Sequence, residues 1–569
     1  MSQFFKVIVT CCITVGMMMT TANAKPKVSG KILDLKGSPI SGATVKLIKS
    51  GQSTVSGDDG SFSFTGNTAI TPSLDGGIAQ PQFAALRNGC LEITASKRTV
   101  ASITGFNLSG KVVYHKKRIV EAGMHAFPIS DMKHGLMLFR VQADGRTVNL
   151  KAYSIGGVIQ GTLKNEKRAV ALRAVAQQDK KVTGVPPILD TLIVTKSGYL
   201  DYDMQICKDE VSGLSLRMAS EDQQVWSRNN CTGIKNSVHA ASILQLHDGT
   251  LLVVYFGGSR EGAQDTQIWL SRKNPGSDKW EDPVVAASGK REGKKYGVGN
   301  PSLFLSRSGK IILLFKLLRK DINNRWGYMT TSLDGGKTWT PQRDLCKGCM
   351  GTEKNKPLQL ADGRILAPKS DRTKVQNGGV GFEVSYDDGE TWEFQNLAPK
   401  NGSIQPAILE LPDGSLRLYT RTKGGLMPTI TTSDYGKTWG KWERSVMPST
   451  GCGFDGLTLR DGRHILVYNH HHSSGKGPRQ FLVMAMSKNA VDWSAAQVVS
   501  NASRGGQFSY AAVIQGNDGL LYIAFTWHRK KIGHVVINPY KITDETLVPM
   551  PDGRWPTSGP LSKGANKDQ

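Results

Sequence analysis

Cysteine is scarce in this sequence of 569 residues, which contains only eight. Two of them lie in an apolar amino-terminal segment, which leaves six in the rest of the chain, too few for a disulfide scaffold. The one closely spaced pair, Cys346 and Cys349, has no second CxxC to complete a zinc site. No βαβ pattern surrounds it, as a thioredoxin-like redox motif would require. We therefore expect either a small loop disulfide or two free thiols at this pair.

Long apolar runs and long helical patterns are also missing beyond residues 1–24. That segment carries Lys6, an apolar run from Val7 to Met19, and the small residues Ala22-Asn-Ala24. This is the organisation of a cleavable secretory signal, and the run is too short to span a bilayer. No lipobox surrounds its two cysteines. We therefore expect a secreted or periplasmic protein that starts near Lys25 and has no membrane anchor.

Acidic residues are outnumbered by basic ones. The chain has 72 Lys and Arg against 47 Asp and Glu, and removal of Lys6 with the signal leaves 71 against 47, or +24. A field of this sign attracts polyanions in general, so nucleic acid, anionic polysaccharide and an acidic cell surface all fit, as does a basic surface kept only for solubility. Because we expect the protein to be exported, a glycan partner is favoured over nucleic acid. We expect an anionic glycan or polysaccharide partner and no nucleic acid.

Turn residues, in contrast, are abundant, with 63 Gly and 24 Pro. The stretch from Gln405 to Arg421, QPAILELPDGSLRLYTR, shows how they are used: two short strands flank a Pro-Asp-Gly turn in which Gly414 takes a positive φ. The same turn recurs at intervals of 60, 54, 51, 48 and 57 residues. The glycines of these turns are Gly249, Gly309, Gly363, Gly414, Gly462 and Gly519. A period of about 50 residues built from short strands predicts a β-propeller, and six repeats predict six blades.

A second motif follows the strand pairs. It reads SLDGGKTW at residues 332–339, SYDDGETW at 385–392 and TSDYGKTW at 432–439, with a worn copy at 487–493. The Asp and Ser or Thr side chains can bond the backbone amides of a turn, and the Trp can pack between strands. We therefore interpret these boxes as structural.

With these boxes, the repeats from Trp226 to Ile542 resemble the BNR, or Asp-box, sialidase superfamily. The resemblance implies a six-bladed propeller over residues 221–545, in which the inner strands converge on one axis. Polar residues at the ends of those strands then line a common mouth. Before the inner strands stand His239, Asn300, Lys356, Gln405, Asp455 and Tyr510, and after the following strands stand Arg260, Arg319, Lys369, Arg421, His470 and Arg529. Polar side chains at one repeat offset are not needed for a core, so we expect a ligand-binding ring.

Sialidases of this superfamily hold a sugar carboxylate with three arginines, and they use a Tyr and Glu pair and an Asp acid. The resemblance assigns the second and third arginines to Arg421 and Arg479, the nucleophile to Tyr510 in FSYAAVI, and the acid to Asp265 in SREGAQDTQIWLSR. Two arginines suit bidentate carboxylate binding, which indicates an acidic sugar.

Two positions depart from that pattern. His239 stands where the first arginine is expected, and Gln405 stands where the Glu is expected. Without the Glu, no base activates Tyr510. A histidine with an ordinary pKa of about 6.5 can serve as acid or base near neutrality, with Tyr510 and Asp265 as its partners, although a structural hydrogen bond is the alternative.

A run of three histidines starts at His470. No acidic or cysteine residue accompanies the run at metal-ligand spacing. We therefore expect one histidine facing the sugar, two in solvent, and no metal or cofactor.

The chain before the propeller reads as two small β-sandwich modules. Alternating strands with Gly-Ser-Pro and Asp-Asp-Gly turns in residues 25–75 resemble the carboxypeptidase regulatory-like sandwich. Its last strand pair, DTLIVTKSGYLDYDMQI, appears only in residues 185–220, so residues 76–184 are interpreted as an insertion. The core of the insertion is similar to the β-sandwich of secretion-sorting tails, and a basic linker ends it. We expect a spacing role, with attachment or glycan contact as alternatives, and a tail at residues 546–569.

Together these features predict an all-β, monomeric, exo-acting glycosidase that cleaves a terminal sialic or uronic acid from an anionic glycan. His239, Asp265 and Tyr510 are its expected catalytic residues. Two alternatives stay open. One is a lyase that eliminates across a uronate with His239 and Tyr510, and the other is a non-catalytic glycan-binding propeller.

Overall fold

The structure is a computed structural model that describes most of the chain. It covers residues 25–65, 182–222, 237–318, 325–371, 379–395, 397–422, 425–471, 479–501 and 507–542. Within residues 84–160, and at 229–232, it describes the backbone of the strands. The predicted signal peptide, linker and tail lie outside the described residues, as do the side chains of Cys90 and Cys231.

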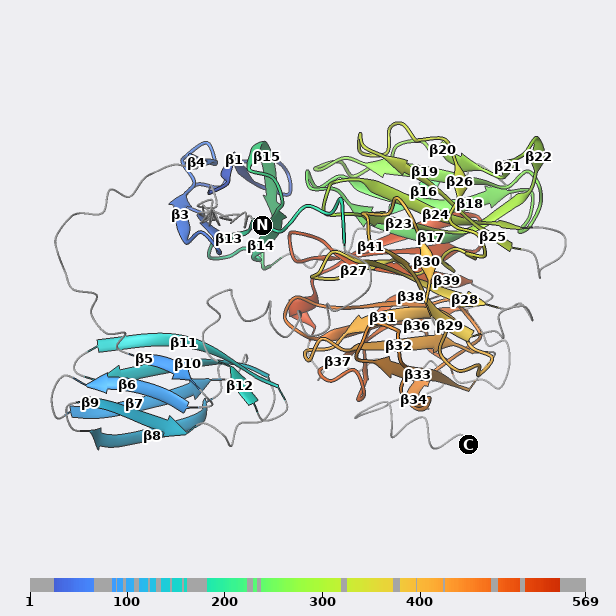
Figure 1. The fold of residues 1–569 in the computed structure, drawn as a ribbon. Helices are drawn as coiled ribbons and strands as arrows, with labels where there is room; N and C mark the ends of the chain where they lie inside the picture. The colour runs from blue at the N-terminus through green and yellow to red at the C-terminus, as the bar shows by residue number, and fades with distance from the viewer. Residues whose placement is uncertain are drawn as a thin grey trace, which may run out of the picture.

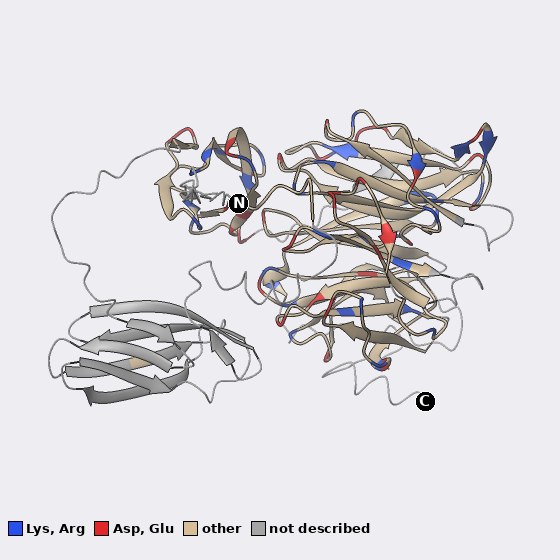
Figure 2. Ribbon diagram, in the orientation of Figure 1, with Lys and Arg blue, Asp and Glu red and all other residues tan. Residues whose placement is uncertain are grey.

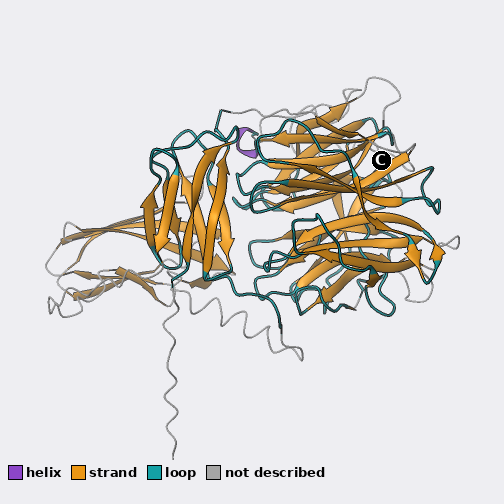
Figure 3. Cartoon of the chain, turned by 90° about the horizontal axis from the view of Figure 1, so that it is seen from above, coloured by secondary structure: helices purple, strands orange, loops and turns teal. Residues whose placement is uncertain are grey.

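Strands make up nearly all of the regular structure, and a single turn of 3-10 helix, η1 (Pro539–Lys541), follows the last strand (Figure 3). Six antiparallel sheets of four strands each form the six blades of a propeller in the described part of the chain (Figure 1). The expected all-β, six-bladed propeller is thereby confirmed. Among the described residues no helix is long and apolar enough to cross a membrane.

The strands run through the blades in chain order. Blade 1 has β17 (Ser237–Gln245), β18 (Leu251–Gly258), β19 (Gln267–Lys273) and β20 (Val284–Ser288), and blade 2 has β23 (Gly297–Leu305), β24 (Ile311–Leu318), β25 (Arg325–Ser332) and β26 (Arg343–Asp344). Blade 3 has β27 (Leu358–Gln359), β28 (Ile365–Asp371), β29 (Gly379–Ser385) and β30 (Glu393–Phe394), and blade 4 has β31 (Ile404–Glu410), β32 (Leu416–Arg421), β33 (Leu426–Thr432) and β34 (Glu443–Pro448). Blade 5 has β35 (Asp455–Thr458), β36 (His464–Asn469), β37 (Phe481–Ser487) and β38 (Ser494–Asn501). Blade 6 has β39 (Phe508–Gln515), β40 (Leu521–Trp527), β41 (Lys531–Ile537) and β16 (Asn229–Thr232), and a small hairpin of β21 (Lys290–Arg291) and β22 (Lys294–Lys295) links blades 1 and 2.

Blade 6 joins the two ends of the propeller. Its outermost strand, β16, comes from before blade 1 and pairs antiparallel with β41 from the end of the chain, with Asn229 opposite His534 and Thr232 opposite Lys531. Without this pairing, β41 would be the exposed edge of the last blade. The ring is therefore closed by backbone hydrogen bonds as well as by packing.

Apolar side chains on both faces of the second strands hold neighbouring blades together. Every residue of β18 is buried, and Val254 and Phe256 in this strand share one apolar cluster with Leu313 and Phe315 of β24 in blade 2. Removal of this surface from water is the main stabilising term of the ring. It also explains why the second strands read as continuous apolar runs, since a strand covered on both faces has no polar side.

The repeated turns and Asp boxes adopt the conformations that their sequences predict. The six turn glycines have φ between 82° and 100°, values that favour glycine. In the first box, Asp334 accepts a hydrogen bond from the backbone N of Thr338 at 2.9 Å, and Ser332 Oγ accepts one from Gly336 N at 2.8 Å. The boxes at 385–392 and 432–439 repeat both contacts. Their structural interpretation is confirmed.

The amino-terminal strands join strands far along the chain in one sandwich. One sheet has the order β15-β1-β4 and the other has the order β14-β13-β2-β3, around buried residues such as Ile32, Leu47 and Leu192. These strands are β1 (Lys27–Asp34), β2 (Thr44–Leu47), β3 (Gln52–Val55), β4 (Ser61–Thr65), β13 (Asp190–Thr195), β14 (Tyr202–Ile206) and β15 (Glu210–Met218). The chain between β4 and β13 forms two further sheets, β12-β11-β10-β7-β8 and β5-β6-β9. Their strands are β5 (Ala84–Arg87), β6 (Cys90–Ala95), β7 (Thr99–Phe106), β8 (Val112–Val120), β9 (Gly123–Pro128), β10 (Gly135–Ala143), β11 (Arg146–Ile155) and β12 (Val158–Gln160).

The first sandwich contacts the propeller at the turns that follow inner strands. Asp203 pairs with Arg460 at 2.6 Å, and its backbone N donates to the carbonyl of Asn517 at 3.1 Å. Arg460 follows β35 and Asn517 follows β39, so both lie at the end of the blades opposite to the start of the inner strands. The sandwich therefore leaves the mouth of the propeller uncovered.

We predict that the propeller folds without the sandwich. A fragment of residues 221–545 should be soluble and unfold cooperatively, because it keeps β16. A matched fragment of residues 237–545 lacks β16 and should unfold roughly 5 °C lower, if the four-residue pairing contributes about 2 kcal/mol. Thermal unfolding followed by circular dichroism compares the two. Equal melting temperatures would show that the strand closure contributes nothing to stability.

Candidate active site

The inner strands share a local distortion where they begin. Register shifts occur between His239 and Ser242 in β17, and at the equivalent places in β23, β31 and β39. Each bulge holds one non-glycine residue in the left-handed region: Ala240 (φ 56°), Asn300 (φ 51°), Gln405 (φ 53°) and Tyr510 (φ 55°). Such backbone is unfavourable by about 1–3 kcal/mol per residue, and bulges commonly re-aim side chains beside active sites. The strain thus singles out the mouth as a functional site.

These bulges correct one expectation. Asn300, Gln405 and Tyr510 occupy equivalent positions, but His239 precedes the equivalent residue of blade 1, which is Ala240. The predicted common offset is therefore wrong for His239 by one residue. Spacing in the sequence does not reveal which residue of a bulge is the extra one.

Arg421 contacts two of the other predicted residues. Its Nη1 donates to Gln405 Oε1 at 2.9 Å and to the Tyr510 hydroxyl at 2.7 Å. Its guanidinium carbon lies 5.6 Å from the centre of the Tyr510 ring, and that of Arg479 lies 5.9 Å from the same centre. Two guanidinium groups from blades 4 and 5 thus flank one phenol of blade 6, a favourable cation–π arrangement.

His239 lies against the same ring but does not titrate as expected. The side chain is buried, its Nδ1 is 2.8 Å from Thr526 Oγ1, and its ring centre is 4.0 Å from that of Tyr510. Burial, followed by the charges of Arg529, Arg479 and Arg421, lowers the pKa of His239 well below its ordinary value. Near neutrality His239 is therefore a neutral imidazole in the free protein, which can accept a proton but does not serve as the acid that we also expected. Its Nε2 has no hydrogen-bond partner among the described residues.

The predicted acid lies in an exposed loop that follows β18. Asp265 is exposed and accepts hydrogen bonds from the backbone N and the hydroxyl of Ser259, at 3.0 and 2.9 Å, so it closes its own loop. The neighbouring Glu261 pairs with Arg529 Nη1 at 2.7 Å, which fastens the loop to blade 6. Arg260 is exposed in the same loop. The structure therefore places Asp265 and Arg260 in a rim loop and Arg529 at its anchor.

Two other predicted ligand contacts, Lys356 and Asp455, already have partners inside the protein. Lys356 Nζ contacts Asp455 Oδ2 at 3.0 Å and the Gly456 carbonyl at 2.7 Å, and the same Asp455 oxygen accepts from the backbone N of Val513 at 3.0 Å. This pair joins blades 3, 5 and 6, so the expected sugar contact is replaced by a brace between blades. Half-buried Asn300 has no such bond among the described residues.

His470 is also more enclosed than expected. It is fully buried and hydrogen-bonded through Nδ1 to the hydroxyl of Tyr468, and burial lowers its pKa well below the ordinary value. A neutral histidine held inside blade 5 fits a structural role. The expectation that it faces a sugar is wrong.

Sequence reasoning missed a lysine at the axis. Lys354 is buried with φ 91°, and its Nζ donates to the carbonyl oxygens of Ala511 and Phe454, the latter at 3.1 Å. Its ammonium group thus links blade 3 to blades 5 and 6 directly behind Tyr510. Burial lowers the pKa of Lys354 to about 8. No pattern in GTEKNKP marks this residue, because a buried lysine looks like a loop lysine in sequence.

A second buried pair stands next to it. Lys316 Nζ lies 3.0 Å from Glu353 Oε1, and both side chains are buried. Ser370 donates to the other oxygen of Glu353, and Ser370 Oγ accepts from the backbone N of Gln405 at 3.4 Å. Removal of one partner from a buried ion pair typically costs about 3–5 kcal/mol, so this cluster fixes the position of the Gln405 bulge.

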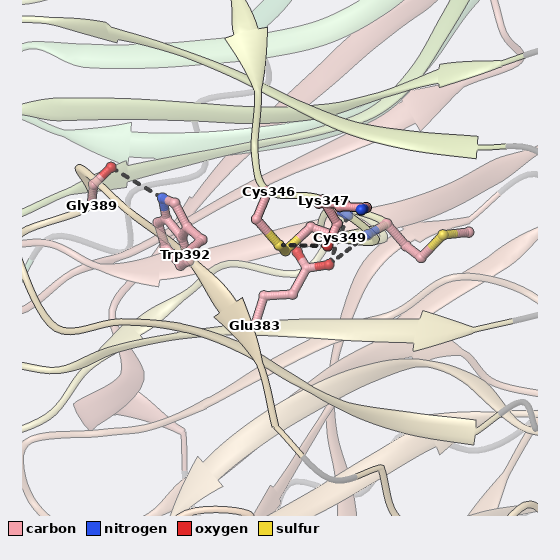
Figure 4. The surroundings of a disulfide bond; sticks show 8 residues. Cys346, Lys347, Cys349, Glu383, Gly389 and Trp392 are labelled. Atoms are coloured by element: carbon pink, nitrogen blue, oxygen red, sulfur yellow. Dashed lines mark hydrogen bonds between the residues drawn. A yellow bond between two sulfur atoms is a disulfide. The ribbon is translucent and has the colours of Figure 1, made fainter. Parts of the chain in front are cut away.

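The segment that carries both buried groups starts at a disulfide. Cys346 and Cys349 are bonded, which settles the open alternative in favour of a loop disulfide. Figure 4 shows Glu383 on β29 beside it, where its Oε1 accepts from the backbone N of Met350 at 2.6 Å and of Gly351 at 3.0 Å. Burial raises the pKa of Glu383. The disulfide and Glu383 together hold the chain that leads to Glu353 and Lys354.

We predict a stability effect of Lys354 with a defined pH window. Its pKa is about 8 in the folded chain and about 10.5 when unfolded, so the unfolded state binds the proton more tightly. Below pH 8 the folded protein must bury the charged ammonium of Lys354, which lowers the free energy of unfolding. Between pH 8 and 10.5 the buried lysine loses its proton, so this unfavourable contribution disappears. Relative to Lys354→Met, wild type should gain up to about 3 kcal/mol over that interval. Urea unfolding at several pH values measures the difference, and a constant difference would contradict the prediction.

Comparisons with known proteins agree with this fold. Residues 249–523 match the family model of the BNR repeat-like domain. A sialidase of Bacteroides fragilis (strain YCH46) is 21% identical over 374 residues, which is 58% of this chain and 65% of that protein. An anhydrosialidase of Macrobdella decora is 24% identical over 191 residues, 30% of this chain and 24% of that protein. This chain thus aligns with less than two thirds of the length of either relative.

Solved structures of sialidases are similar in part. A mutant of Trypanosoma rangeli sialidase with trans-sialidase activity aligns with 56% of this chain and 58% of its own, at 16% identity and a TM-score of 0.43. The Hadza microbial sialidase Hz136 aligns with 91% of this chain and all of its own, at 13% identity and a TM-score of 0.48. Residues 249–523, which lie within the six blades described above, therefore match the BNR repeat-like domain, and the curated relatives of the chain are a sialidase and an anhydrosialidase.

Proposed function

We propose that this protein is a secreted glycosidase of sialidase-like type that removes a terminal acidic sugar from an anionic glycan. One observation carries the proposal: Arg421 holds the Tyr510 hydroxyl at 2.7 Å while Arg479 flanks the same ring. A sugar whose carboxylate is attached to its anomeric carbon, as in sialic acids, can meet both arginines while that carbon faces the phenol. Arg–carboxylate pairs of this kind are strong and directional.

The chemistry follows from the same groups. The Tyr510 oxygen attacks the anomeric carbon, the glycosidic C–O bond breaks, and the departing alcohol takes a proton from Asp265. Water then breaks the tyrosyl–sugar bond and returns a proton to Asp265. Gln405 cannot accept the proton that Tyr510 loses, whereas the neutral His239, whose ring packs on that of Tyr510, can accept it at the unpaired Nε2 and return it to the phenolate when the tyrosyl–sugar bond breaks. The cation of Arg421 stabilises the developing phenolate.

Export of the protein is part of the proposal. The leader-like residues 1–24 support it, and so does the Cys346–Cys349 disulfide, since such bonds persist in oxidising compartments.

A lyase is the second candidate, and the state of His239 favours it. A neutral imidazole with a free Nε2 beside a phenol is a base and acid pair suited to elimination across a uronate. His239 would take the proton next to the carboxylate, a double bond would form, and the departing oxygen would take the proton of Tyr510. The arginines would neutralise the carboxylate and so make that proton easier to remove.

Product mass separates these functions. The purified protein is incubated with sialosides and with uronate-capped oligosaccharides, and the products are weighed by mass spectrometry. Hydrolysis adds the mass of one water to the sum of the products, and this result is expected. Elimination adds none and creates a conjugated double bond that absorbs ultraviolet light. Binding without any product would indicate a non-catalytic glycan-binding propeller.

We predict that the Arg421→Ala change weakens binding of an acidic sugar by about 2–5 kcal/mol, because a desolvated charge partner is lost. Arg421→Lys should recover only part of this, since the planar fork is absent. Arg417→Ala on the same strand is the matched control, because Arg417 pairs with Glu443 and not with the mouth. Calorimetry with the sugar and its carboxyl-reduced form measures the effect. Equal losses for both ligands would contradict a carboxylate role.

We also predict the outcome of restoring the missing carboxylate. Because Gln405 Oε1 already accepts from Arg421, a Gln405→Glu side chain should form an ion pair with that arginine and compete with the substrate. KM should rise by about tenfold, a change of about 1.4 kcal/mol, with no gain in kcat. Steady-state kinetics on the substrate found above test this. A large gain in kcat would instead show that Gln405 stands in for an absent base.

A further inference from the structure

A basic hairpin projects from the connection between blades 1 and 2. Its strands β21 and β22 pair Lys290 with Lys295 and Arg291 with Lys294. The turn residues Glu292 and Gly293 have φ of 49° and 75°, as in the type I′ turn that fits a twisted two-residue hairpin. Backbone bonding between Tyr296 N and the Gly289 carbonyl, at 2.9 Å, closes the base. The hairpin is therefore a regular element.

Arg291 fastens this hairpin to blade 2. Its Nε and Nη2 donate to the two carboxylate oxygens of Asp344, at 3.2 and 2.8 Å, a bidentate pair. Its guanidinium carbon lies 4.5 Å from the centre of the Trp326 ring, whose other neighbour is the ring of Tyr296 at 5.5 Å. The charge of Arg291 is thus neutralised by Asp344 within the protein.

The three lysines of the hairpin, in contrast, are not neutralised by an acidic residue of the described part of the chain. Lys290, Lys294 and Lys295 are exposed, and none forms an ion pair within the described ranges. Three like charges on a six-residue hairpin repel one another, so they do not stabilise the fold. Figure 2 shows β21 and β22 in blue at the outer edge of the propeller. A partner of opposite charge explains their arrangement better than packing does.

The hairpin lies at the same end of the blades as the loop of the candidate acid. It joins the last strand of blade 1 to the start of the inner strand of blade 2, which is the mouth end of both. Directly after it, Val298 N donates to Thr266 Oγ1 at 2.8 Å, and Gly297 packs against the carbonyls of Gly262 and Ala263 so closely that a Cβ would lie 2.8–2.9 Å from them. The two residues that follow the hairpin and its closing Tyr296 therefore contact the loop that carries Asp265.

We propose that the hairpin of residues 290–295 binds the anionic glycan chain that continues from the terminal sugar, on the leaving-group side of the bond to be cleaved. The inference rests on the proposed function, because the acid protonates the departing chain and the residues that follow the hairpin contact the loop of that acid. Repeated carboxylates along such a chain match three free ammonium groups. The Trp326 ring at its base already packs against Arg291 and, edge-on, against Tyr296, which leaves less of it for stacking on nucleic-acid bases.

The test uses the mature full-length chain and a triple variant, Lys290→Ala/Lys294→Ala/Lys295→Ala. A triple Lys→Arg variant keeps the charges. The matched control removes three exposed lysines elsewhere, Lys46, Lys279 and Lys337. Fluorescein-labelled polysialic acid and hyaluronan are the polymer probes in anisotropy titrations at low and high salt. Turnover is measured on each polymer and on its trisaccharide.

The triple alanine variant should bind the cleaved polymer about tenfold more weakly at low salt, since three exposed charge contacts are lost. Its KM for the polymer should rise by a similar factor, with kcat and the kcat/KM of the trisaccharide unchanged. The arginine variant and the control should behave as wild type. High salt should remove the difference between variants.

Other results would overturn the inference. An equal loss in the control would assign the effect to net charge, and an equal loss on the trisaccharide would place the hairpin in the terminal-sugar site. Hairpin-dependent binding of labelled single-stranded DNA as tight as that of the polymer would indicate a nucleic-acid surface. If wild type cleaves neither polymer nor trisaccharide, the proposed function fails, while the anisotropy titrations still decide the role of the hairpin.

Discussion

Six inner strands meet at one axis, and the polar groups that they bring there must be paired without much help from water. Lys354 donates to carbonyl groups of blades 5 and 6, Lys316 pairs with Glu353, and Lys356 pairs with Asp455. Each of these contacts joins different blades. A buried group without its partner costs several kcal/mol, so the pairings specify one arrangement of the ring as well as stabilising it. The positions of the functional side chains depend on this polar axis.

The mouth uses that rigidity to hold strained backbone. Gln405 and Tyr510 sit in the left-handed region, which non-glycine residues adopt only when their surroundings enforce it. The surroundings are identifiable: Ser370 and Asn355 bond the backbone of Gln405, and Lys354 bonds the carbonyl next to Tyr510. The same distortion turns both side chains toward Arg421. The favourable packing of the blades thus offsets the unfavourable backbone conformation of Gln405 and Tyr510, and this conformation sets the geometry of the site.

Electrostatics divide the mouth into two parts. Around Tyr510 the charges are arginines, and they act together with burial to keep His239 neutral although it stands where a fixed positive charge is expected. On the rim, Glu261 and Asp344 neutralise Arg529 and Arg291, whereas the hairpin lysines keep their charge exposed to solvent. An acidic terminal sugar suits the first part, and a longer anionic chain suits the second. Part of the excess of basic residues in the sequence is therefore concentrated at the mouth end of the propeller, in the arginines around Tyr510 and the lysines of the hairpin.

Sequence alone determined the repeat and what depends on it. Glycine turns at regular spacing and Asp boxes specify strands locally, because a turn with positive φ and a side chain bonded to its own loop need only neighbouring residues. The sequence pattern also identified Gln405, Arg421 and Tyr510, since position within a repeat maps onto position around an axis. Tertiary structure decided the rest. Whether Lys356 meets a sugar or Asp455, whether His239 is charged, and whether a lysine such as Lys354 is buried all depend on contacts between blades far apart in the chain, and burial and electrostatic fields arise only when those blades are packed together.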